Sequence, residues 1–260
     1  MKYISPTSYN LFYRDREEFV FTYILGYDRR PQTAPMAIGS AFDCFIKNYL
    51  QMHLDMPIIH YWNMEPEHEE IATELGSKAF QLYKNSGALY ELIEMLGDGV
   101  QFETRILKEV WGIPLLGLPD IHWPGVVLDW KVNGWMAKRP PSPRKGYLRD
   151  RWTGRKTKKH PQYGINFEEI EKTWATQLCF YSWLLEESDP LVGIEQVIPE
   201  RVVSYRGKIS QKFKDTTKSR ILHLWERVTT GWYLDTETKQ ESDDLMGVYK
   251  DKDFVEVLRA

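Results

Sequence analysis

Residues 117–132 read GLPDIHWPGVVLDWKV, and this pattern predicts two strands joined by the tight turn Trp123-Pro124-Gly125. Side chains alternate between the two faces of a strand, so Asp129 and Lys131 share one face of the second strand. The turn folds the end of the first strand back and places Asp120 beside Asp129. The stretch therefore predicts two carboxylates and an ammonium group on one side of a sheet.

Such a group of side chains suits a metal-assisted reaction at a phosphate. Two neighbouring carboxylates repel each other unless a divalent cation neutralises them, and hard oxygen ligands favour Mg²⁺ or Mn²⁺. We therefore expect Asp120 and Asp129 to hold such an ion. Lys131 can polarise the attacking water or stabilise charge that gathers on the phosphate. The alternative is an exposed ion pair on a strand, because a lone Asp-x-Lys recurs by accident.

The spacing of these residues resembles a known signature. Pro119-Asp120, eight intervening residues and then Asp129-Trp130-Lys131 are similar to the motif of the PD-(D/E)xK nuclease superfamily. The resemblance implies an α/β fold in which α and β are mixed, with a restriction-endonuclease-like αβββαβ core and a central mixed sheet flanked by helices. It covers the chain from Ser5 to about Tyr205 and implies a single nuclease domain over residues 1–260.

The rest of the sequence predicts elements in that order. Apolar periodicity predicts helices from Ser5 to Gly26 and over residues 36–52. Strands over 102–110 and 113–122 should precede the strand that carries Asp129, and the three should form an antiparallel meander. The later expectations are a helix over about 167–187, one or two strands over 194–205, a helix over 213–234, a helical insertion over about 55–99 and a long basic loop over about 134–163.

Gln177 and Tyr181 are four residues apart and share one face of the helix that follows the meander. The pair resembles the QxxxY motif of the RecB-type branch of the superfamily. This resemblance implies that Gln177 and Tyr181 belong to the active site and help to position the substrate. The alternative is a polar helix position beside a packed tyrosine.

Gly39 to Asp43 resembles the GxxxH element of the same branch, with Asp in place of His. A carboxylate is a harder metal ligand than imidazole, so the difference bears on metal preference more than on activity. The resemblance implies that Asp43 is a third metal ligand. The alternative is an exposed Asp43 that pairs with Lys47 at i,i+4. Glu103 is a further candidate for the outer shell of the metal.

The N-terminal segment Ser5–Phe12 resembles the capped opening helix of RecB-type and AddB-type nucleases. Those proteins often carry a cysteine nearby as part of an iron–sulfur site, whereas this sequence has Arg14-Asp15-Arg16. The chain contains only two cysteines, so a four-thiolate cluster within one subunit is excluded. We expect no iron–sulfur cluster.

A basic segment follows the strand that carries Asp129 and Lys131. Between residues 138 and 159 it holds ten Lys and Arg against the single acid Asp150, in a chain of net charge −3. Interleaved aromatic residues could stack on bases while the cations neutralise phosphates, as in single-strand binders. The alternative is an ordinary solvated loop. The predicted DNA interface comprises Lys138, Arg139, Arg144, Lys145, Arg149, Arg151, Trp152, Arg155, Lys156, Lys158 and Lys159.

The composition of the chain bears on its cellular compartment and on its contact with nucleic acids or membranes. A net charge of −3 argues against a uniformly basic nucleic-acid binder. The sequence has no apolar run of membrane-spanning length and no cationic segment followed by an apolar one at its start. The two cysteines show no zinc-finger or CxxC spacing. We expect a cytoplasmic protein that does not enter a membrane.

The function that these features predict is a stand-alone exonuclease of recombination, repair or replication, similar to small phage RecB-type nucleases. Its substrate would be DNA that is single-stranded or has a free end, and RNA stays open. A helicase or a single-strand-binding protein is a candidate partner, since the sequence has no P-loop for ATP-driven unwinding. The alternatives are a structure-selective or nicking endonuclease on the same fold, and a nucleic-acid-binding module without turnover.

Overall fold

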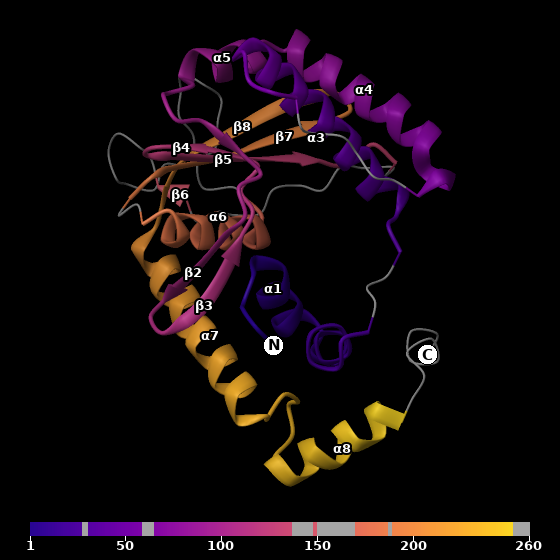
Figure 1. Cartoon of the computed structure of the whole chain (residues 1–260), viewed down its shortest axis with the longest axis vertical. Helices are drawn as coiled ribbons and strands as arrows, with labels where there is room; N and C mark the ends of the chain where they lie inside the picture. Colours follow the sequence, from indigo (N-terminus) through magenta and orange to yellow (C-terminus); the bar gives the residue numbers. More distant parts are fainter. Residues whose placement is uncertain (28–30, 59–64, 137–147, 150–169, 187–188, 252–260) are drawn as a thin grey trace. The chain divides into compact units, whose positions relative to one another are not determined.

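The computed structural model describes residues 1–27, 31–58, 65–136, 148–149, 170–186 and 189–251 (Figure 1). Its contacts divide the chain into two compact units. The single nuclease domain expected over residues 1–260 stays a prediction. The first unit comprises Met1–Arg30, Ile106–Gly117 and Gln211–Ala260, and the second comprises Pro31–Arg105 and Leu118–Ser210.

The second unit is built on a six-stranded sheet with the order β1-β4-β5-β7-β8-β6. β5 and β7 are parallel, and the other neighbouring pairs are antiparallel, so the sheet is mixed. Asp129 on β5 is in register with Ile194 on β7, and Lys131 with Gln196. The strands are β1 (Gln101–Phe102), β4 (Ile121–Trp123), β5 (Val126–Val132), β6 (Leu148–Arg149), β7 (Leu191–Ile198) and β8 (Arg201–Ile209).

Helices cover both faces of this sheet. α3 (Ala34–His53), α4 (Glu69–Asn85) and α5 (Ala88–Met95) lie on one face, and α6 (Lys172–Leu184) lies on the other (Figure 1). The central mixed sheet flanked by helices confirms the expected fold class. The stretch expected as a helical insertion contains α4 and α5, preceded by the 3₁₀ turn η2 (Pro66–His68).

The alternation along β5 agrees with the sequence pattern. Leu128 and Trp130 join a buried apolar cluster with Phe42 of α3 and Tyr83 of α4. Asp129, on the opposite face, contacts α6 through Gln177. The strand therefore fixes itself in the core through one face and presents polar groups to α6 through the other.

The close crossing of α3 and α4 depends on a glycine. A Cβ added to Gly76 of α4 would lie 2.6 Å from the Cβ of Ala41 and 3.0 Å from the backbone nitrogen of Phe42. Only a residue without a side chain allows the two helices to approach so closely. This crossing holds in place the helix that carries Asp43.

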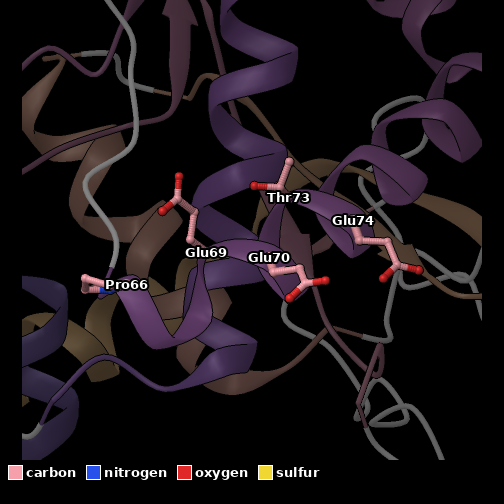
Figure 2. A pocket seen from close by; sticks show the side chains of 5 residues that line it. All are labelled: Pro66, Glu69, Glu70, Thr73 and Glu74. Carbon is pink, nitrogen blue, oxygen red and sulfur yellow. The ribbon is translucent and has the colours of Figure 1, made fainter.

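The first turns of α4 carry a different group of acids. They line a surface hollow of about 640 Å³, and Figure 2 shows their side chains spread along the helix. Carboxylates near a helix N-terminus are favourable for the helix, but they repel a polyanion. This hollow is therefore not a candidate nucleic-acid interface. Its lining comprises Pro66, Glu69, Glu70, Thr73 and Glu74.

The first unit contains a capped N-terminal helix, as expected. Ser5 and Ser8 form a reciprocal capping box at the start of α1. The helix expected from Ser5 to Gly26 is nevertheless interrupted, because Asp15 adopts an extended conformation and caps the next turn. The elements of this unit are α1 (Pro6–Arg14), α2 (Arg16–Phe19), the π-helix η1 (Val20–Leu25), β2 (Ile106–Val110), β3 (Ile113–Gly117), α7 (Gln211–Thr230) and α8 (Lys239–Asp251).

The three continuous strands predicted for the meander are not all present, because two of them are each divided into two shorter strands. The strand expected over 102–110 is divided into β1 and β2, and the strand expected over 113–122 is divided into β3 and β4. β2 and β3 form a separate two-stranded sheet, while β1 and β4 join β5 in the central sheet. Glu103 ends β1 with a φ of 47°, in the left-handed region, which breaks the strand.

The two tight turns expected in this region are present. Trp111 and Gly112 have φ of 56° and 73° and connect the paired residues Val110 and Ile113. Positive φ at both central residues is the conformation that two-residue hairpin loops favour.

No helix among the described residues is both long and apolar enough to cross a membrane.

Candidate active site

One cavity of the second unit brings together five of the residues singled out in the sequence. Its volume is about 570 Å³, and its lining comes from α3, β5, α6 and the segment before β4. Tyr181, a sixth predicted residue, contacts Gln177 just behind that lining. The five predicted residues in the lining are Asp43, Asp120, Asp129, Lys131 and Gln177.

Asp129 is the most deeply buried of these groups, with 1% of its surface exposed. The ammonium of Lys131 contacts its Oδ2, and Gln177 Nε2 donates a hydrogen bond to its Oδ1 at 3.0 Å. Burial, together with the charge of Asp120 and a hydrogen bond with that carboxyl, raises the pKa of Asp129 to about 7, although Lys131 opposes this rise. The carboxyl of Asp129 therefore takes up a proton near neutral pH.

Gln177 connects the groups of this site. Lys131 Nζ donates to Gln177 Oε1 at 2.9 Å, and Gln177 Nε2 also donates to the hydroxyl of Tyr181 at 2.6 Å. That hydroxyl donates in turn to the carbonyl of Leu118 at 2.9 Å. One amide thus orients the ammonium of Lys131 and the carboxyl of Asp129, and a tyrosine holds that amide. Gln177 is thus a polar helix position that contacts Asp129 and Lys131 as well as the buried Tyr181, and its part in the activity stays a prediction.

The hydroxyl of Tyr181 keeps its proton. Burial, followed by the charges of Asp129 and Asp120, raises the pKa of Tyr181 well above its usual value. Tyr181 therefore remains a hydrogen-bond donor to Leu118, two residues before Asp120.

Asp120 is held by the backbone of β5. The backbone nitrogen of Trp130 donates to Asp120 Oδ2 at 2.9 Å, and Lys47 Nζ lies 3.6 Å from Oδ1. Because Trp130 adjoins Asp129 in the chain, this hydrogen bond brings the two carboxylates together as the sequence predicts. This proximity explains why the charge of Asp120 contributes to the raised pKa of Asp129.

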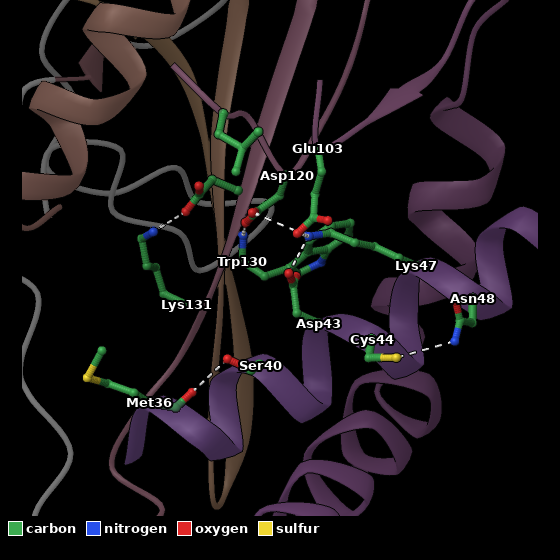
Figure 3. A network of polar contacts seen from close by, with 12 residues as sticks. Met36, Ser40, Asp43, Cys44, Lys47, Asn48, Glu103, Asp120, Trp130 and Lys131 are labelled. Atoms are coloured by element: carbon green, nitrogen blue, oxygen red, sulfur yellow. Dashed lines mark hydrogen bonds and ion pairs between the residues drawn. The ribbon is translucent and has the colours of Figure 1, made fainter. Parts of the chain in front are cut away.

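Asp43 pairs with Lys47, but not on the surface. Figure 3 shows the ammonium of Lys47 between the carboxylates of Asp43, Glu103 and Asp120. The i,i+4 pair anticipated as the alternative for Asp43 is present, yet Lys47 is only 1% exposed, so an exposed ion pair is the wrong description. Burial lowers the pKa of Lys47, but the charges of Asp120 and Asp43 outweigh it and raise that pKa above its usual value.

The donor set fits a divalent cation in its chemistry. Burial, followed by the charge of Asp120, raises the pKa of both Asp43 and Asp129, and a bound cation would favour their ionised forms. Among the residues that the structure describes, however, no three Asp, Glu, His or Cys side chains are arranged as a ready metal site. The ammonium groups of Lys47 and Lys131 lie against these carboxylates instead.

No protein-family model matches the chain, and no curated protein matches it either. Among solved structures, a candidate exonuclease from Eubacterium rectale aligns with 88% of this chain and 82% of its own, with a TM-score of 0.53 and 15% sequence identity. At that identity the likeness shows a shared fold. A second structure, that of SSO0001, aligns with 82% of this chain and 85% of its own at 12% identity, but its TM-score of 0.27 supports no argument.

Sequence reasoning missed the position of Lys47. The i,i+4 spacing to Asp43 indicated an ion pair, but no local pattern indicated that Glu103, 56 residues away, completes it at 2.7 Å. Glu103, expected in the outer shell of a metal, contacts this lysine, and its role toward a metal stays a prediction.

The predicted DNA interface falls almost wholly outside the described residues. Of Arg149 only the backbone is described, as part of β6, where it pairs with Lys208 of β8. The interface stays a prediction. The residues outside the described part are Lys138, Arg139, Arg144, Lys145, Arg151, Trp152, Arg155, Lys156, Lys158 and Lys159.

Proposed function

We propose that the protein is a metal-dependent deoxyribonuclease of the PD-(D/E)xK superfamily, in its RecB-type branch. The observation that carries the proposal is the convergence of Asp120, Asp129 and Lys131 with Gln177 in one cavity. The charged residues come from a strand and the segment before a neighbouring strand, and Gln177 comes from the helix packed on them. Their chemistry suits hydrolysis of a phosphodiester bond.

The carboxylates of Asp120 and Asp129, with Asp43, would hold the Mg²⁺ or Mn²⁺ ion. A bound ion of this kind supplies a Lewis acid and lowers the pKa of a water molecule. The raised pKa of Asp129 is consistent with this role, because a bound cation would favour its ionised form against burial and the negative charge of Asp120.

Lys131 would act on the charge that develops at the phosphate. Its ammonium is fixed by Gln177 and Asp129, so it is oriented before the substrate binds. Gln177 and Tyr181 would serve as positioning residues, because Gln177 hydrogen-bonds to Asp129 and Tyr181 hydrogen-bonds to Gln177. The basic segment at residues 138–159 would neutralise the phosphates of the bound strand.

An exonuclease is the form of this activity that we favour. The QxxxY spacing at Gln177 and Tyr181 and the fold shared with the candidate exonuclease support it. A structure-selective or nicking endonuclease on the same fold is the second candidate, because the open cavity itself does not require a DNA end.

Cleavage of linear and of covalently closed DNA distinguishes an exonuclease from an endonuclease. The full chain is incubated with Mg²⁺ or Mn²⁺ and three DNAs: end-labelled single-stranded, end-labelled double-stranded and covalently closed circular. We expect a linear DNA to be shortened while the closed circle survives, and a chelator to stop the reaction. Nicking of the circle would instead establish the endonuclease. Cleavage of none of the three DNAs with either ion would refute the proposed activity and leave a binding module.

A further inference from the structure

Lys47 is a buried cation that the proposed reaction does not use. It lies on α3, is 1% exposed, and is surrounded by three carboxylates (Figure 3). Its Nζ contacts Asp43 Oδ2, lies 2.7 Å from Glu103 Oε1 and 3.6 Å from Asp120 Oδ1. Burial of an ammonium group away from water is strongly unfavourable without such partners, so the three carboxylates are needed to hold the charge of Lys47 in the interior.

Glu103 is held in position for this contact. Its φ of 47° is uncommon for a residue with a side chain, and its backbone N–H donates to the carbonyl of Asp120 at 3.2 Å. Strained backbone of this kind persists only where the surrounding structure imposes it. The chain thus directs a third carboxylate toward the ammonium of Lys47 and away from a regular strand.

The balance of charge in the cluster indicates what Lys47 replaces. Counted as ionised groups, Asp43, Glu103, Asp120 and Asp129 oppose the two ammonium groups of Lys47 and Lys131, which leaves two negative charges. A single divalent ion neutralises that remainder. Without Lys47, the same carboxylates would leave three negative charges, which is more than one divalent ion can neutralise. The position of the Lys47 ammonium among these carboxylates would then suit a second hard cation.

We propose that Lys47 is a resident cation that takes the place of a second divalent ion, so that the site binds a single Mg²⁺ or Mn²⁺. The inference rests on the proposed function for the identity of that ion. Lys47 acts as a positioning residue, because it holds Asp43 and Asp120 in the orientation in which they face the cavity. The ion would then be left to Asp129 and the free faces of these two carboxylates.

The test counts ions without any need for activity. Isothermal titration calorimetry with Mn²⁺ alone measures the number bound per molecule of the full chain, as wild type and as Lys47→Met. Methionine is an unbranched side chain one heavy atom shorter than lysine, and it carries no charge. We expect one ion in the wild type and two in Lys47→Met. One ion in both proteins, or two in the wild type, would overturn the inference.

A matched control is available on the neighbouring helix. Lys78 of α4 forms an i,i+4 ion pair with Glu74 but is 59% exposed. Lys78→Met removes the same charge from a solvated pair, so it should leave the count at one. A gain of an ion in Lys78→Met as well would overturn the specific role of Lys47.

A second variant decides the matter if Lys47→Met does not fold. Glu103→Gln keeps Lys47 in place but removes one negative charge from the cluster, so the count should stay at one while the affinity for Mn²⁺ falls. A loss of the bound ion in Glu103→Gln would overturn the inference, because Glu103 would then serve the metal rather than Lys47. If the folded wild type binds no Mn²⁺, the metal dependence of the proposed function fails. The role of Lys47 is then upheld if Lys47→Met gains an ion and overturned if it does not.

Discussion

At the scale of single residues, the carboxyl of Asp129 links the site to the stability of the fold. Its pKa in the folded protein is about 7, above its usual value of 3.8, because of burial and the charge of Asp120. The folded state therefore holds a proton that the unfolded state has already released. Stability that is fully present below pH 3.8 is lost as the pH rises through about 7.

We predict that the metal-free protein becomes less stable between about pH 4 and pH 7, by on the order of a few kcal/mol. Urea denaturation in a chelator, followed by circular dichroism, measures this for the wild type and for Asp129→Asn. The variant lacks the titrating group and should lose less stability over the same range. Parallel pH profiles for the two proteins would show that Asp129 does not titrate in this way.

The residues of the site differ in how far the sequence could predict them. The period of two in a strand places Asp129 and Lys131 on one face, and the i,i+4 spacing of a helix places Gln177 and Tyr181 on one face. That the second pair belongs to the site is what its resemblance to the QxxxY motif implies. The burial of Lys47 was not predicted, because it depends on a carboxylate 56 residues away. A local pattern carries no information about such a contact.

At the scale of secondary-structure elements, the sequence predicted the segments of β4, β5, β7 and β8, but not where two of the expected strands are divided. It also did not predict β6, which lies within the stretch expected as a basic loop. The apolar alternation runs without interruption through Phe102 to Val110, yet the left-handed conformation of Glu103 divides this segment into β1 and β2. The second break follows Gly117 and includes Pro119, which lacks a backbone donor for a ladder. Both breaks flank the carboxylates of the site, where the chain departs from regular structure.

The packing of α3 on α4 gives a prediction of opposite effects at two glycines. Gly76→Ala places a Cβ 2.6 Å from that of Ala41, and we expect a loss of about 1–3 kcal/mol from the overpacked crossing. Gly39→Ala on α3 meets nothing within 4 Å, and alanine favours the helix by roughly 0.4–1 kcal/mol. Urea denaturation of the two variants should move the midpoint in opposite directions. A Gly76→Ala protein as stable as the wild type would show that the helices are free to separate.

At the scale of the whole molecule, a net charge of −3 requires that any attraction to DNA be local. We predict that replacing Arg149, Arg151, Arg155 and Lys156 together with Gln weakens DNA binding and its dependence on salt. The slope of log K against log salt should fall by about 0.7 for each lost contact with a single-strand phosphate.

Fluorescence anisotropy of a labelled oligonucleotide across a salt series measures that slope. Turnover at saturating DNA should change little, because Asp120, Asp129 and Lys131 remain in place. A quadruple variant with the slope of the wild type would mean that the basic segment is only a solvated surface, and the path of the strand would have to be sought elsewhere on the molecule.

We propose that Asp120, Asp129 and Lys131 form the catalytic centre of a metal-dependent nuclease. Single-turnover cleavage of end-labelled DNA with Mn²⁺ by the wild type, Asp120→Asn and Lys131→Met tests this assignment. Asparagine at position 120 keeps an oxygen for the backbone nitrogen of Trp130, so the fold should survive. Glu74→Gln, at an exposed ion pair of α4, serves as the control.

We expect Glu74→Gln to cleave like the wild type and Asp120→Asn to have no measurable activity. Lys131→Met should cleave more slowly by roughly 10²-fold or more while it binds DNA nearly as well. Circular dichroism of each protein confirms that it is folded. Cleavage by a folded Asp120→Asn protein at the rate of the wild type would show that these residues are not the catalytic centre.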